Sequence, residues 1–199
     1  AQMNVYARRG NSMRLNGIDA VLLNREQVKE IIPMADFSDN VRFPIFGGLM
    51  QPSAGTARHD AVAWGYARQA DSMGVDIIQN CEVKKIITKN GSVEGVETTK
   101  GIINSKKIGV VASGHTSILA ESAGIKLPLQ SRPLQALVSE PIKPIINTVV
   151  MSNAVHAYVS QSDKGELVIG AGTDGYNSFT QRGGHDVIED TVRAMVELY

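Results

Sequence analysis

The stretch VKKIITKNGSVEGVET, residues 83–98, has two alternating segments on either side of an Asn90-Gly91 pair. Alternation of β-branched with charged residues is typical of half-buried strands. Asn-Gly is the strongest short signal for a two-residue hairpin turn, because both residues adopt positive φ at low cost. The stretch therefore predicts two antiparallel strands, and Lys100-Gly101 turns the chain into a third strand at residues 102–105.

Helical patterns flank this predicted meander. Residues 58–73 repeat apolar side chains at a spacing of three and four, which predicts a helix, and residues 116–123 predict a second one. Residues 75–78 and 107–112 are apolar enough to be strands. The block from 58 to 124 thus runs helix, strand, antiparallel meander, strand, helix. It suits half of a Rossmann-like dinucleotide-binding domain in which the crossover is a β-meander.

The second half of the chain has a different pattern. Its short alternating or apolar segments predict an antiparallel sheet, which we expect to form a separate domain on the substrate side. The predicted strands are residues 134–139, 149–151, 157–160 and 167–169, and Asp163-Lys164-Gly165 is the hairpin turn between the last two. Residues 186–199 carry the apolar spacing of one helix face.

The opening fingerprint of a dinucleotide-binding domain, G-x-G-x-x-G after a first strand, is absent from these residues. Gly170-Ala171-Gly172 resembles its start, but Gly175 comes too late and no helical pattern follows it directly. We interpret the triplet as a strand-end turn, with a phosphate loop as the alternative. The final helical pattern reaches Tyr199 without a cap, so we expect an internal piece of a longer chain.

Composition and charge exclude several classes of function. Lys and Arg together number 20, as do Asp and Glu, so no net field draws the chain to nucleic acid or to an anionic membrane. Cys81 is the only cysteine, which excludes an internal disulfide framework and indicates a reducing compartment. No apolar run approaches the roughly 18 residues of a membrane helix. We therefore expect a cytoplasmic α/β protein whose local groups supply the binding.

His59 is the candidate for chemistry that stands out from the residues alone. It lies in the first turn of the helix predicted at residues 58–73, where the positive helix end disfavours a charged imidazole and leaves a neutral nitrogen free to attack or ligate. The ordinary alternative is an exposed or hydrogen-bonded histidine without such a role. No second His or carboxylate pair at metal-ligand spacing supports a zinc site.

The segment GTARHDAVAWGYA, residues 55–67, resembles the stretch that carries the covalent flavin in the family of heterotetrameric sarcosine oxidase beta subunits. Matched residue by residue, the resemblance implies that His59 bonds the 8α carbon of an FMN. Arg58 and Thr56 of the same motif are then candidate flavin contacts. Arg58 would stabilise negative charge on the isoalloxazine, bind a phosphate or face solvent.

Other segments resemble the same family along nearly the whole chain. The match around VDIIQNCEV, residues 75–83, implies that the backbone of Val83 meets the FAD adenine. VVASGHTS, residues 110–117, matches the end of a nucleotide-domain strand, which implies that Ala112, Ser113 and Gly114 approach FAD closely. The chain departs from the family at the next two positions, where His115-Thr116 replaces a common Ala-Trp pair.

Tyr158 is the candidate catalytic residue. It aligns where related amine oxidases place an aromatic side chain near the substrate. Further matching segments are residues 127–129, 132–135, 140–144, 158–170 and 174–178.

The resemblance implies a D-amino-acid-oxidase-like fold with three parts. Residues 1–50 would be part of the substrate domain or a connection, residues 51–127 a partial Rossmann-like FAD-binding domain, and residues 128–199 a truncated substrate domain with an antiparallel or mixed sheet. The catalytic base and the oxygen-activating group are expected outside these residues.

The implied activity is oxidation of sarcosine, or another N-methyl amino acid, to glycine and formaldehyde. Noncovalent FAD would take the electrons, FMN on His59 would receive them, and O₂ would leave as hydrogen peroxide. An alpha subunit and further subunits are the expected partners, and tetrahydrofolate in the assembly would capture the one-carbon unit. Three alternatives stay open: a dimethylglycine or sarcosine dehydrogenase with covalent FAD, a non-catalytic subunit that only holds flavin, and a plain globular interaction domain without flavin.

Overall fold

The computed structural model describes residues 2–199, apart from the side chain of Ala171. The chain divides into two compact units. The first comprises the residues up to Thr56 together with Leu134–Thr173 and Gly183–Tyr199. The second comprises Ala57–Pro133 and Asp174–Arg182. Compactness alone assigns no cofactor, so the FAD-binding domain at residues 51–127 stays a prediction.

The N-terminal part of the first unit holds two helices and a two-stranded sheet. The elements are α1 (Gln2–Leu15), β1 (Val21–Asn24), α2 (Arg25–Ile31) and β2 (Gly47–Met50), with β1 and β2 antiparallel. A capping box starts α2: the Gln27 N–H donates to the Asn24 side chain, and the Asn24 N–H donates to the Gln27 side chain, both at 2.9 Å. Val28, Ile32 and Ala35 bury a small core behind it.

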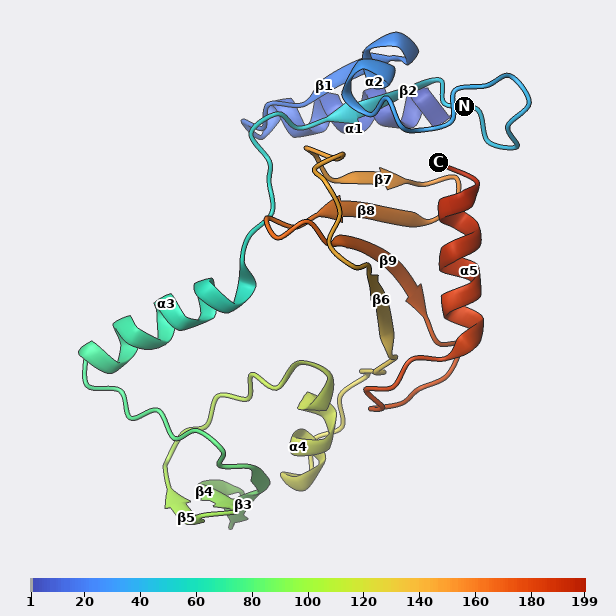
Figure 1. Cartoon of the computed structure of the whole chain (residues 1–199). Coiled ribbons are helices and arrows are strands. Elements are labelled where there is room, and N and C mark those ends of the chain that lie inside the picture. Colours follow the sequence, from blue (N-terminus) through green and yellow to red (C-terminus); the bar gives the residue numbers. More distant parts are fainter. Residues whose placement is uncertain (1) are drawn as a thin grey trace. The chain divides into compact units, whose positions relative to one another are not determined.

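The main sheet of the first unit contains β6 (Leu134–Val138), β7 (Val150–Ser152), β8 (Ala157–Gln161) and β9 (Leu167–Thr173). The order is β6-β9-β8-β7 and every neighbouring pair is antiparallel, which confirms the predicted sheet. The helix α5 (His185–Val196) packs against β9, β6 and β8 (Figure 1).

Among the described residues of the first unit, only one face of this sheet is covered by another element. Val159, 2% exposed, lies on the covered face, where Val159, Ile169 and Met195 are among the apolar side chains around a cavity of about 320 Å³. On the other face Leu134, Val138 and Met151 are mostly exposed. The strands therefore alternate between a face that packs on α5 and a face without cover among the described residues.

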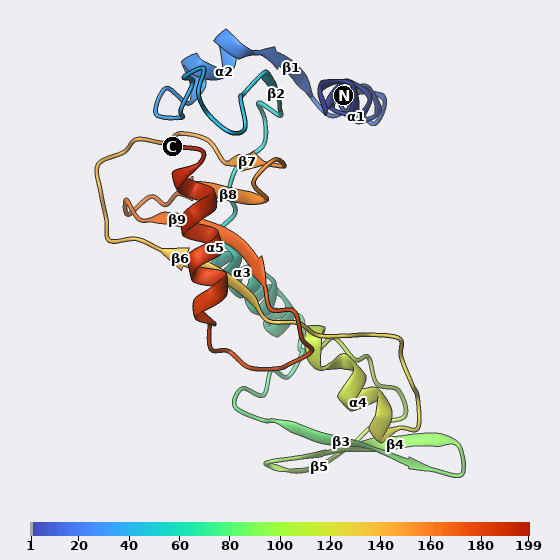
Figure 2. The same ribbon diagram turned by 90° about the vertical axis from the view of Figure 1, so that its right-hand side faces the viewer.

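The second unit begins with α3 (His59–Ser72) and continues with the predicted meander. Its strands are β3 (Val83–Lys89), β4 (Ser92–Thr98) and β5 (Gly101–Asn104), paired antiparallel in that order. A 3₁₀ turn η1 (Ser113–His115) leads into α4 (Thr116–Ser122), which lies against β3 in both views (Figures 1 and 2). The Ile86 N–H donates to the Ser122 hydroxyl at 2.9 Å and ties helix to strand.

Two predicted strands of this unit are wrong. Residues 75–78 and 107–112 form no strand, and Val111 is 98% exposed. A strand needs a neighbour to satisfy its backbone groups, and among the described residues neither segment has one. Elsewhere α1 and β1 were not predicted, because the polar sequence of α1 has no apolar stripe and β1 is short.

The apolar segment at residues 43–49, broken by two glycines, predicts a strand, but the strand forms at Gly47–Met50 instead. Pro44 has no N–H to donate to a ladder, which excludes it from the paired part. The helices predicted at residues 58–73, 116–123 and 186–199 are confirmed within a few residues at each end. No helix in residues 2–199 combines the length and the apolar character that a membrane span requires.

The β3–β4 hairpin depends on the backbone of its turn, where Asn90 has φ 52° and Gly91 has φ 75°. We expect Gly91→Ala to lower the free energy of unfolding by about 1–2 kcal/mol, the cost of a left-handed conformation for a residue with Cβ. Nothing lies within 4 Å of a Cβ at this position, so the loss of unfolding free energy would come from the backbone conformation and not from a steric clash. Urea denaturation of the natural protein measures it.

Gly109→Ala is the matched control, because its Cβ also meets nothing within 4 Å and its φ is not left-handed. Its free energy of unfolding should change by no more than about 0.5 kcal/mol. Equal losses in the two variants would contradict the assignment of the cost to the turn.

Candidate functional site

His59 is the first residue of α3, and the structure leaves it open. Arg58 is the N-cap, with extended backbone at φ −74° and ψ 93° and without a side-chain cap. Every side chain from Gln51 to Tyr66 is exposed. Within the described residues α3 packs against no other helix or strand. The imidazole therefore has room around it for a large group.

The start of α3 carries local charge. The Ala61 N–H donates to the Asp60 carboxylate at 2.8 Å, and this bond holds the pKa of Asp60 below its ordinary value. The positive charges of Arg58 and His59 lower that pKa further. The stabilisation is present above the ordinary value of 3.8 and is lost as the pH falls through the lowered pKa. At neutral pH an ionised Asp60 therefore stands beside His59.

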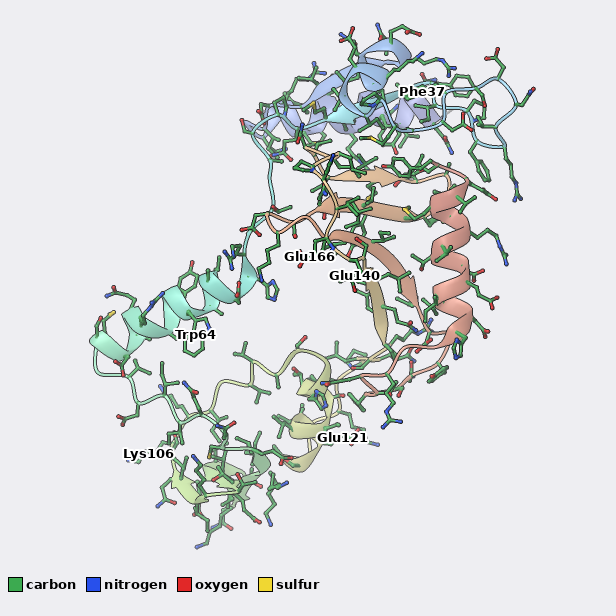
Figure 3. The ribbon with its side chains drawn as sticks, viewed as in Figure 1. Phe37, Trp64, Lys106, Glu121, Glu140 and Glu166 are labelled. Atoms are coloured by element: carbon green, nitrogen blue, oxygen red, sulfur yellow. The ribbon has the colours of Figure 1, made fainter. Side chains whose placement is uncertain are left out.

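The exposed surface of α3 is apolar as well as open. Trp64 is 55% exposed, and Val62, Tyr66 and Met73 are exposed with it. Figure 3 shows the Trp64 side chain projecting from the helix. A helix whose large apolar residues are exposed is expected to gain stability from whatever covers it.

Ala112, Ser113 and Gly114 form a tight turn before α4. Ser113 has φ 46°, a left-handed conformation that costs a residue with Cβ about 1–2 kcal/mol. The Gly114 carbonyl accepts a hydrogen bond from the Ser131 hydroxyl at 2.6 Å. A Cβ on Gly114 would lie 3.2 Å from that hydroxyl oxygen, so a glycine lets Ser131 come close.

Two further contacts hold this turn in place. The Ser178 N–H donates to the Ser131 carbonyl at 2.9 Å, and the ring of Phe179 stacks on His115 with centroids 4.7 Å apart. Ser131 thus bonds both to the turn and to the segment Asp174–Arg182. Strained backbone persists where surrounding contacts determine it, and such places are common at ligand sites.

Val83 opens β3 and pairs with Thr98, with an irregularity in the register directly after it. The turn at Ala112–Gly114 leads straight into α4, and α4 packs on β3. Val83 and the turn therefore belong to one packed layer of the second unit. His59 lies on α3, and α3 packs on neither β3 nor α4. Thr56 belongs to the first unit, as the last residue of its N-terminal segment.

Tyr158 lies in β8, on the face of the main sheet opposite α5, and is partly buried. Sequence reasoning missed Ser131 and Phe179, which no local pattern marks. It also misread Gly170-Ala171-Gly172 as a strand-end turn: the triplet lies inside β9. The strand that begins with the apolar segment Leu167–Ile169 continues through the triplet, and this apolar segment was the available sequence signal for it.

Ser131→Ala is expected to lower the free energy of unfolding by about 1 kcal/mol, because it removes one hydrogen bond that holds a strained turn. Ser92→Ala, at an exposed position of β4, is the control and should change stability by less than about 0.5 kcal/mol. Thermal and urea unfolding of the natural protein compare the two. A Ser131 variant as stable as the control would show that the turn does not need this bond.

Comparisons with known proteins agree with this architecture. The family model for FAD dependent oxidoreductases matches residues 1–199. Sarcosine oxidase subunit beta of Rhizobium meliloti (strain 1021) is 57% identical over 194 residues, which cover 98% of this chain and 46% of that protein. Sarcosine oxidase subunit beta of Arthrobacter sp is 53% identical, over 96% of this chain and 47% of that protein. The chain thus spans about half the length of these relatives.

Among solved structures, L-proline dehydrogenase from P. horikoshii superposes with a TM-score of 0.88, at 24% identity, over 99% of this chain and 52% of the other. This likeness confirms the mixed α/β fold with its antiparallel sheets. The family match over the whole chain and the two close relatives lead to one conclusion. The chain belongs to the FAD dependent oxidoreductase family.

Proposed function

We propose that the natural protein oxidises sarcosine to glycine and formaldehyde, in the manner of the sarcosine oxidase beta subunits that it resembles. The reaction balances as sarcosine, O₂ and water giving glycine, formaldehyde and hydrogen peroxide. The observation that carries the proposal is the setting of His59: the matched motif lies in the exposed first turn of α3, with open space around the imidazole. Identities of 57% and 53% to two such subunits support it.

His59 is the residue that would hold FMN covalently. Attachment needs an imidazole nitrogen and space for the isoalloxazine, and the exposed first-turn His59 offers both. Arg58 directly precedes His59 and Thr56 lies three residues before it, and both would contact the flavin. A covalently held FMN supplies a second place for electrons on their way to O₂.

FAD would bind without a covalent bond at Val83 and at Ala112–Gly114. The turn fits a cofactor, because its residues are small, Ser113 and Gly114 are exposed, and its backbone is held by Ser131, which itself accepts a hydrogen bond from the Ser178 N–H. Small side chains let backbone groups approach a ligand closely. Bound FAD supplies the electron acceptor for amine oxidation, while the chain positions it.

The remaining parts of the proposal concern substrate and partners. Tyr158, on the uncovered face of the main sheet, would contact the small N-methyl amino acid. An alpha subunit is the proposed cover for α3, because Val62, Trp64 and Tyr66 are apolar and exposed there. Tetrahydrofolate elsewhere in a cytoplasmic assembly would take up the one-carbon unit.

Two rival functions make different predictions for the same preparation. A dimethylglycine or sarcosine dehydrogenase type would carry FAD on a differently placed histidine. A flavin-holding subunit would carry cofactor but would not react. The test is to purify the natural protein with its subunits, add sarcosine without oxygen and record the flavin spectrum. Bleaching supports the proposal, and an unchanged spectrum with bound flavin would favour the non-catalytic subunit.

His59→Ala is expected to abolish the covalent flavin while noncovalent FAD stays bound. Mass spectrometry of the peptide that contains position 59 measures this: the wild-type peptide should carry the mass of FMN, and the variant peptide none. Acid precipitation gives a second readout, because covalent flavin stays with the protein and FAD is released.

His185→Ala is the matched control. His185 is the first residue of α5, as His59 is of α3; both helices lack a side-chain cap, and an Asp follows each histidine. The control should keep its covalent FMN. An unmodified His59 peptide from active wild-type protein would refute the attachment, and an adduct with the mass of FAD on a peptide with a different histidine would point to the dehydrogenase type.

A further inference from the structure

Gly170 lies directly under the ring of Tyr158. The two residues are cross-strand partners in β9 and β8. A Cβ built on Gly170 would lie 2.6 Å from both Cε1 and Cζ of Tyr158 and 2.7 Å from its hydroxyl oxygen. Contacts this short do not occur, so any side chain at position 170 would displace the ring. Gly170 is buried under the phenol end of Tyr158.

An irregularity in β9 decides the face on which this contact lies. The pairing of β6 with β9 joins Ala136 to Gly170 and Gln135 to Gly172, so one residue of β9 is skipped. A skipped residue is a β-bulge, and it reverses the side to which the following residues point. A Cβ on Gly172 would accordingly meet Val187 and Thr191 of α5, whereas a Cβ on Gly170 meets Tyr158 on the opposite face.

The two glycines therefore have different tasks. Gly172 lets α5 approach the covered face, which is a packing role. Gly170 opens the uncovered face, where the row Met151–Tyr158–Gly170–Ala136 crosses all four strands. The two residues beyond Tyr158 in this row are the smallest available, so the ring can lie across β9 instead of standing away from the sheet.

Backbone conformation does not explain the glycine at 170. Its φ lies outside the left-handed region, unlike Gly165 in the hairpin turn, with φ 98°. An alanine would suit the backbone of a strand, and glycine inside a strand costs stability. The three heavy atoms nearest to a Cβ at this position all belong to the ring end of Tyr158, at 2.6–2.7 Å. The absence of a side chain at position 170 therefore makes room for the Tyr158 ring.

We propose that Gly170 is a positioning residue for amine oxidation: it lets the Tyr158 ring lie flat on the open face of the sheet, where the ring contacts the small amino-acid substrate. This inference rests on the proposed function, since it needs a substrate on that face. Bulges are frequent beside active sites, where they redirect side chains, and the bulge next to Gly170 fits that use.

Gly170→Ala in the natural protein with its cofactors and subunits tests the inference. We expect kcat/KM for sarcosine to fall on the order of 100-fold, the cost of displacing a positioned group by about 1 Å. The flavin content and the covalent adduct at His59 should stay unchanged. The same substitution in a Tyr158→Ala background should change kcat/KM by no more than about twofold, because no ring remains to be displaced.

Tyr158→Phe supplies the conservative control. It keeps the ring, so Gly170→Ala should remain harmful in this background. Equal effects of Gly170→Ala in the Phe and Ala backgrounds would mean that the glycine acts through the backbone, and the inference would be wrong. If the Gly170→Ala protein does not accumulate, the activity of the Tyr158→Ala variant is the test. A Tyr158→Ala variant as active as wild type would overturn the role of the ring.

A readout independent of turnover separates failure of this inference from failure of the proposed function. Protein labelled with 3-fluorotyrosine gives a ¹⁹F resonance for Tyr158, assigned by its loss in Tyr158→Phe. It should shift when sarcosine is added under anaerobic conditions, and Gly170→Ala should change both its position and that response. A wild-type flavin that sarcosine does not reduce would refute the proposed function.

Under that outcome the same resonance is followed with a panel of small amino acids and N-methyl amines. A shift caused by a compound that reduces the flavin would support the placement of Tyr158. A resonance that no such compound moves, or that Gly170→Ala leaves unchanged, would overturn the inference.

Discussion

Backbone pairing between β8 and β9 is the constraint on which the first unit depends. Four residue pairs, from Tyr158–Gly170 to Gln161–Leu167, hold these central strands, and β6 and β7 attach on either side. Because side chains alternate along a strand, this register sends Val159 and Ile169 toward α5 and Tyr158 to the other face. A slip by one residue would bury the tyrosine and expose the apolar core, so the same hydrogen bonds define both the core and the open surface.

In the second unit the candidate cofactor residues are held differently, because the sheet is small and these residues lie mainly on turns. Ser113 keeps a strained conformation where Ser131 and Phe179 hold the chain around it. At the start of α3, by contrast, the groups that the structure places beside His59 are local: the backbone dipoles of the first turn and the charge of Asp60. One candidate site is thus fixed by tertiary contacts and the other by its position on a helix.

Local signals were enough for much of the fold. Asn90-Gly91 specified its hairpin because turn chemistry is encoded in two adjacent residues, and the apolar spacing specified α3 and α5. The strands predicted at residues 75–78 and 107–112 were wrong, because apolar character does not reveal whether a partner strand is present. The role of Gly170 was also beyond sequence reasoning: it depends on a bulge and on a residue of the neighbouring strand, and neither is visible in local spacing.

The division into two units affects how the chain can be cut or truncated. The backbone passes between the units four times, after Thr56, Pro133, Thr173 and Arg182. A single protease cut at any one of these junctions leaves the units joined by the other three. Neither unit can be produced by a simple truncation, and neither could be exchanged in evolution by one recombination event. The two halves of this architecture are therefore inherited and expressed together.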